Sequence, residues 1–361
     1  MKKWDMGQGK STFPGKKGRA VFSDVSGRKR YLAALLMILA MVGVSEFLGE
    51  KEIIFPEMAA LAVGMWIVDK RVWRVGRIAM IVMMTSGATW GVVLVRYSAL
   101  PLMVNLALAF SFAAAILLLM RASLIPLLSA CMLPVVLQTE SWVYPIAVSV
   151  MSVILVIGQG VMEKYGLRKK IIHVPVGKDR KKEIVRWGRL LFSWVLIAFF
   201  PVYTSNLYCI LPPLVVTYVE FANSKSGFRN RPVQIYLLLV TAAVLGSVSQ
   251  FVGYVLWELP ESMIACVLFL CLFTLFELSG KFFAPAGAVA LIPMIIPAKD
   301  LLWFPFQIAV GTAVFIGVAM LFFLKCYKWP KSHLIVCMLP TYLRRIRKRR
   351  TGKRVVRETD A

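Results

Sequence analysis

Histidine is almost missing from this chain, and acidic residues are scarce. The 361 residues include 2 His, and only 18 Asp and Glu stand against 43 Lys and Arg. Both histidines, His173 and His333, lie in stretches rich in Lys and Arg. A haem or a histidine-based metal site within an apolar segment is therefore not expected, and we predict no metal and no cofactor.

Motifs for disulfides and for catalysis are absent as well. Six cysteines occur without a C-x-x-C pair and lie in or beside apolar runs, which is typical of small packing residues. The sequence contains no H-E-x-x-H, no G-x-S-x-G and no Walker loop. We predict that the protein has no catalytic residues and is not an enzyme.

Long apolar runs are what the sequence has in abundance. Hydrophobic residues make up 59% of the chain and the mean hydropathy is +0.73. A helix needs about 20 apolar residues to cross a bilayer core, and several runs reach that length. We predict an all-α, polytopic transmembrane bundle of ten to twelve segments, at 31–48, 53–68, 78–95, 100–120, 123–138, 142–161, 190–207, 208–222, 233–257, 262–280, 282–297 and 301–325.

Three of these segments are short for a full crossing, namely 123–138, 208–222 and 282–297. About 15 residues of helix reach only about 23 Å, which suits interior, tilted or re-entrant pieces better than full spans.

The basic residues are distributed unevenly about these segments. If the first segment leaves the cytoplasm, all but three of the 43 Lys and Arg fall on the cytoplasmic side, the exceptions being Lys51, Arg96 and Lys299. This asymmetry predicts that both termini are cytoplasmic. It also explains the basic pI without nucleic acid, because the charges would lie against anionic lipid headgroups.

The same pattern divides the chain into five regions. We predict a basic cytoplasmic N-terminal segment, a first transmembrane repeat, a basic cytoplasmic linker, a second transmembrane repeat and a basic cytoplasmic tail, at 1–30, 31–161, 162–189, 190–325 and 326–361.

An internal duplication is the most informative feature. Proline and glycine landmarks recur in the same order at offsets of 155 to 160 residues, and the pairs are Pro56 with Pro213, Gly91 with Gly246, Pro126 with Pro285, Pro134 with Pro293, and Pro145 with Pro305. We predict two six-segment repeats in one orientation, related by an axis along the membrane normal. Chance placement of proline and glycine in apolar sequence is the alternative.

The repeated prolines are candidate solute-binding elements. Proline is favoured in the first turn of a helix, where backbone N–H groups lack partners and the dipole favours an anion. A helix that starts within the membrane could hold an anion in this way, and the hypothesis names Pro56, Pro126, Pro213, Pro285, Ala286, Gly287 and Ala288. The alternative is that these prolines only kink packed helices.

Carboxylates in apolar runs are candidates for proton coupling. An ionised group within the membrane is costly, so Glu57, Glu220 and Glu277 are functional candidates. The alternative is that these carboxylates lie near the membrane–water interface, where they snorkel to water or form hydrogen bonds.

The second half resembles the HPP family of integral membrane proteins. The likeness covers about 115 residues, 210–325, and rests on ILPPLVVTYVEF, the SKSGFRNRP loop, FELSGKFFAPAGAVALIPMIIP and LLWFPFQIAVG. The family's His-Pro-Pro-Ala-Gly-Ala element reads Phe283-Ala284-Pro285-Ala286-Gly287-Ala288 here, so the family's His and first Pro are replaced. The resemblance implies a transmembrane protein, with nitrite transport attributed to plant plastid members.

Two functional hypotheses follow. The first is a transporter or channel for a small solute, an anion such as nitrite being the example, with its site at the interface of the two repeats. The second is a membrane scaffold or assembly subunit that docks partners through its basic linker and tail. In both cases we expect a multi-pass protein of a bacterial-type cytoplasmic membrane that binds no nucleic acid, and a homo-oligomer is compatible with either.

Overall fold

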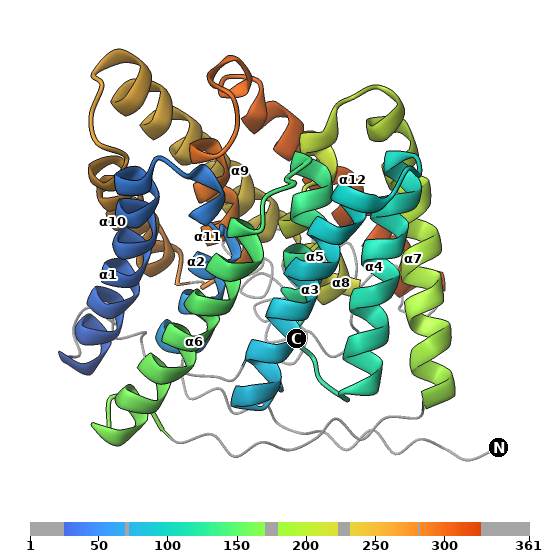
Figure 1. The fold of residues 1–361 in the computed structure, drawn as a ribbon, viewed down its shortest axis with the longest axis horizontal. Coiled ribbons are helices and arrows are strands. Elements are labelled where there is room, and N and C mark those ends of the chain that lie inside the picture. Colours follow the sequence, from blue (N-terminus) through green and yellow to red (C-terminus); the bar gives the residue numbers. More distant parts are fainter. Residues whose placement is uncertain (1–24, 69–71, 170–179, 223–231, 281, 326–361) are drawn as a thin grey trace, which may run out of the picture.

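The computed structural model describes residues 25–68, 72–169, 180–222, 232–280 and 282–325. These residues form a bundle of twelve α-helices (Figure 1), and eight of them are long and apolar enough to cross a membrane. The chain is therefore a multi-pass helical membrane protein. The long helices are α1 (Val25–Leu48), α3 (Arg77–Tyr97), α4 (Leu102–Leu119), α6 (Val143–Lys164), α7 (Arg180–Tyr203), α9 (Pro232–Gln250), α10 (Glu261–Ser279) and α12 (Phe304–Lys325).

The four other helices are short. They are α2 (Glu57–Ala62), α5 (Leu127–Leu137), α8 (Pro212–Ala222) and α11 (Ala284–Leu291). A π-helical turn at Val63–Ile67 continues α2, and a 3₁₀ turn at Ile292–Met294 continues α11. Each unit of about 11 residues reaches about 16 Å, roughly half the hydrocarbon thickness.

The sequence predicted three of these short helices as weak segments, and this is confirmed at α5, α8 and α11. The fourth short helix, α2, was not predicted, because 53–68 was predicted as one continuous segment. In the structure a 3₁₀ turn at Lys51–Ile53 and an extended stretch precede α2, which begins only after Pro56.

Helix α7 also differs from expectation, since it begins at Arg180 and not near 190. The segment limits followed hydropathy, but Lys, Arg and Glu are good helix formers. A helix can therefore run past its apolar part, and a portion of the linker 162–189 is helical.

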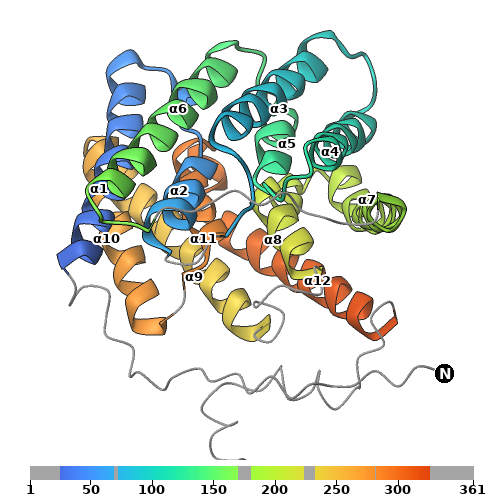
Figure 2. The same ribbon diagram turned by 90° about the horizontal axis from the view of Figure 1, so that it is seen from below.

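The short helices occupy the interior. Figure 2 shows α2, α11, α8 and α5 surrounded by the longer helices. Every residue of α2 and α11 is buried, as is nearly every residue of α5 and α8. The long helices each bury one face and expose large apolar side chains on the other, as lipid contact requires.

The two halves interlock. Helix α1 packs against α10 of the second half, and α7 packs against α4 of the first half. In the interior α2 contacts α11, and α5 contacts α8. Neither half therefore encloses its own core.

Two glycines make the same close contact in the two halves. A Cβ on Gly91 of α3 would lie 2.4 Å from the carbonyl oxygen of Cys131 and 2.6 Å from Pro134 Cγ in α5. A Cβ on Gly246 of α9 would lie 2.3 Å from the carbonyl oxygen of Ala290 and 3.0 Å from Pro293 Cγ. Glycine is required at both positions because the short helix packs directly on the backbone of the long one.

Candidate functional site

The four prolines singled out in the sequence all stand at the start of a short helix. Pro56 and Pro126 immediately precede α2 and α5, while Pro213 and Pro285 are the second residues of α8 and α11. This is the position that proline favours, since its missing N–H would have no helical partner there.

The starts of α2, α5 and α11 lie close together. The Ser129 hydroxyl in the first turn of α5 donates a hydrogen bond to Oε1 of Glu57, the first residue of α2. A Cβ on Gly287 of α11 would lie 3.4 Å from Ala59 of α2. We call this place, defined by Glu57, Ala59, Ser129 and Gly287, the junction.

The junction lies about halfway along the bundle. Helix α2 leads towards the start of α3, and α5 leads towards the start of α6. Helices α3 and α6 pack together and run in opposite directions (Figure 1). The first turns of α2 and α5 therefore meet between the two ends, where a membrane protein is farthest from water.

A carboxyl group occupies the junction. Glu57 is 1% exposed, and its Oε2 has no hydrogen-bond partner among the described residues. Tyr144 of α6 is also buried, donates a 3.2 Å hydrogen bond to the carbonyl of Ala130 and lies within electrostatic range of Glu57. A buried carboxyl with one unpaired oxygen is costly, which marks it as a functional candidate.

The backbone amides of the junction are already hydrogen-bonded. The Leu127 and Leu128 N–H groups donate to the carbonyls of Leu124 and Ile125 at 3.1 and 3.0 Å, and the Met58 N–H donates to Phe55 at 2.9 Å. An anion at these helix starts would therefore have to replace turns that precede the helices. The anion hypothesis at the prolines stays a prediction, and this conformation offers no free amide at these three positions.

The other two carboxylates predicted for proton coupling lie elsewhere. Glu277 near the end of α10 accepts a 2.6 Å hydrogen bond from the Tyr31 hydroxyl of α1. Glu220 near the end of α8 accepts a 2.9 Å hydrogen bond from the Trp73 indole. Both tie the second half to the first, and the structure does not bring them to Glu57.

A small pocket lies at the far end of α2. It encloses about 80 Å³ and is lined by the π turn at Gly64 and Met65 and by Trp73, Arg77, Gln159 and Arg168, among others. Arg77 forms an ion pair with Glu163 at 2.5 Å. Helix α2 and its π turn thus run from the junction to a pocket that contains two arginines, on the side where α3 begins.

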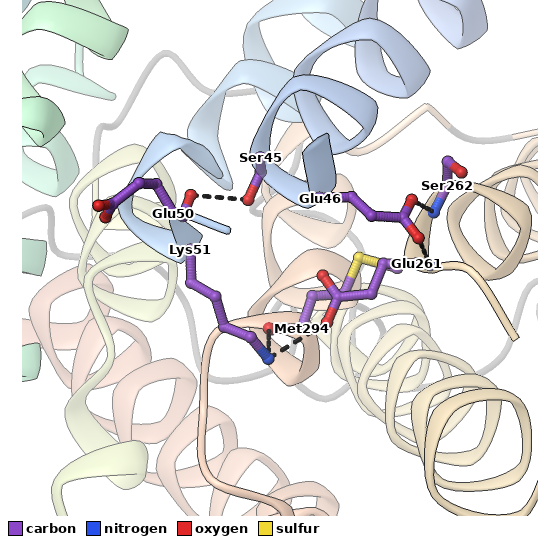
Figure 3. Close-up of polar contacts among 7 residues, drawn as sticks. All are labelled: Ser45, Glu46, Glu50, Lys51, Glu261, Ser262 and Met294. Atoms are coloured by element: carbon purple, nitrogen blue, oxygen red, sulfur yellow. Dashed lines mark hydrogen bonds and ion pairs between the residues drawn. The ribbon is translucent and has the colours of Figure 1, made fainter. Parts of the chain in front are cut away.

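Sequence reasoning missed a polar cluster at the opposite end of the bundle (Figure 3). Glu46 of α1 accepts hydrogen bonds from the N–H groups of Glu261 and Ser262, both at 3.1 Å, and so caps α10. Lys51 forms a 3.2 Å ion pair with Glu261 and donates to the Met294 carbonyl at 3.3 Å. The available signal was Lys51 itself, one of three basic residues outside the predicted cytoplasmic regions.

No protein-family model, curated protein or solved structure matches this chain. The resemblance of 210–325 to the HPP family stays a prediction.

Removing the Ser129 hydroxyl should destabilise the junction. We expect Ser129→Ala to lower the free energy of unfolding by at least about 1 kcal/mol, because Glu57 loses its hydrogen-bond donor in a fully buried place. Thermal unfolding in detergent measures the effect. Ser111→Ala is the matched control, since that hydroxyl donates only to the Ala107 carbonyl of its own helix, and equal midpoints for the two variants would contradict the expectation.

Proposed function

We propose that the protein is a transporter for a small solute whose path runs through the junction. The observation that supports this most is the set of four buried short helices within a ring of long ones, with a carboxyl group where α2, α5 and α11 start. A purely structural bundle has no need of interrupted helices or of a buried carboxyl. Discontinuous helices are the elements from which many transporters build solute sites near the membrane midplane.

The proposal includes two repeats in one orientation, with both termini on the cytoplasmic side. The matching contacts of Gly91 and Gly246 support the duplication, because corresponding helices pack through corresponding residues. The exchange of partners between α1 and α10 and between α7 and α4 fits the same internal symmetry. The path would then lie at the interface of the repeats, where α2 meets α11 and α5 meets α8.

The conformation described is closed at the junction. Glu57, Ala59 and Ser129 are at most 1% exposed, so water does not reach them. Transport would require the short helices to separate, so that the junction opens first to one side of the membrane and then to the other. The pocket beside Arg77 and Arg168 is the natural opening on the side where α3 begins.

Uptake into proteoliposomes tests the proposal, with nitrite and nitrate as the first solutes. We expect saturable uptake that is lost in Gly287→Leu, because a leucine would force α11 away from Ala59. Gly317→Leu is the matched control, since a Cβ at Gly317 of α12 meets nothing within 4 Å.

The second hypothesis, a scaffold that docks partners, predicts no uptake. Folded, inserted protein that takes up none of the tested solutes would favour it. Of its docking elements, the tail 326–361 and residues 170–179 of the linker lie outside the described residues.

A further inference from the structure

We propose that Glu57 is a proton-binding site and that its protonation is required for an anion to pass the junction. The inference rests on the proposed transport function and names its coupling ion. It stands on the burial of Glu57, on its unpaired oxygen and on the absence of a basic partner within the part of the junction that the structure describes.

The groups that face Glu57 are neutral. Helix α5 contributes the Ser129 hydroxyl, and the Tyr144 hydroxyl of α6, which donates to the Ala130 carbonyl, lies within electrostatic range. Helix α11 brings only Ala, Pro, Gly, Val and Leu, and the buried side chains of α1 between Ala34 and Val42 are apolar. A buried carboxylate without a cation is costly, so this packing accommodates the neutral acid.

The hydrogen bonds leave room for one proton. Ser129 donates to Oε1, and Oε2 has no donor and no acceptor among the described residues. A hydroxyl on Oε2 therefore displaces no existing contact.

Glu57 would bind and release its proton by simple exchange with water. On one side of the membrane a hydronium ion transfers a proton to the Glu57 carboxylate, an O–H bond forms on Oε2, and water is released. On the other side that O–H bond breaks, its electron pair stays on the carboxylate, and water takes the proton. No oxidant, reductant or further reactant is needed.

Coupling to an anion follows from electrostatics. An anion that passes the junction comes close to Glu57 in a place with little water, where two like charges repel strongly. The neutral acid removes this repulsion, whereas the carboxylate opposes entry. A proton and an anion are therefore carried in the same direction, and the anion returns only when the proton returns.

Transport measurements test the coupling. We expect the wild-type protein to accumulate nitrite in liposomes when the outside is more acidic than the inside. Glu57→Gln, which keeps an oxygen for Ser129 but cannot titrate, should lose this accumulation, and any remaining flux should no longer depend on pH. Glu140→Gln, an exposed glutamate at the end of the bundle where α6 begins, should accumulate nitrite like the wild type. Undiminished accumulation in Glu57→Gln would overturn the coupling.

Infrared difference spectroscopy tests the proton site without any transport. Between acid and alkaline buffer we expect a carboxylic acid C=O band that titrates in the wild type and in Glu140→Gln and is missing in Glu57→Gln. No band difference between wild type and Glu57→Gln would overturn the proton site. A titrating band in protein that takes up no anion would refute the proposed transport of anions and leave the proton site standing.

Discussion

Replacing Gly246 or Gly91 by alanine is expected to remove most of the folded protein. The new Cβ would lie 2.3 or 2.4 Å from a carbonyl oxygen of the packed short helix, closer than real Cβ contacts come. The obstacle is backbone, which cannot rotate away as a side chain can. The long and short helices must separate, at a cost of about 3 kcal/mol.

The yield of monodisperse protein in size-exclusion chromatography and the thermal unfolding midpoint measure this loss. Gly317→Ala provides the control, because its Cβ enters open space and alanine is the better helix former by about 1 kcal/mol. A comparison of Gly91→Ala with Gly246→Ala also tests the proposed duplication. A large loss at Gly246 with no loss at Gly91 would show that the two contacts are not equivalent.

Reversing the charge of Lys51 should loosen the seam between α1 and α10. The Lys51 side chain is half exposed, but the Glu261 side chain is only 8% exposed. In Lys51→Glu a second carboxylate replaces the cation, and the Met294 carbonyl loses its donor. We expect a loss of about 2 kcal/mol, between the values of exposed and buried ion pairs.

A double variant separates the ion pair from other effects. Lys51→Glu combined with Glu261→Lys should recover part of the lost thermal stability, whereas Lys299→Glu should lose little, because Lys299 is exposed. If the double variant is no more stable than Lys51→Glu, the loss does not come from the ion pair.

Hydropathy predicted the helices well because lipid imposes a simple rule. Every lipid-facing segment must be a helix of apolar residues, so the segments predicted at 78–95 and 262–280 lie within a few residues of α3 and α10. The predicted helix ends were less accurate where the end is decided by a factor other than burial. Arg180 begins α7 in basic sequence, and Pro56 rather than Ile53 sets the start of α2.

The candidate site could be predicted only in part. Repeated prolines pointed to the starts of the short helices, since proline has a strong positional preference. The partner of Glu57 was not predictable, because Ser129 lies 72 residues away and, although it follows Pro126 closely, no sequence pattern links it to Glu57. Likewise no sequence pattern shows that Glu46 caps α10.

The tie between α1 and α10 bears on how the protein is made. Tyr31 and Glu277 are 246 residues apart in the chain, and Glu46 is 215 residues from its partner Glu261 in the first turn of α10. During synthesis α1 enters the membrane before α10 and faces lipid until the second half has followed. Chain release after the first half would leave its α1 and α4 without the helices that cover them. Quality control in the cell should therefore recognise a half-length product as unassembled, and the two halves expressed as separate chains should accumulate only together.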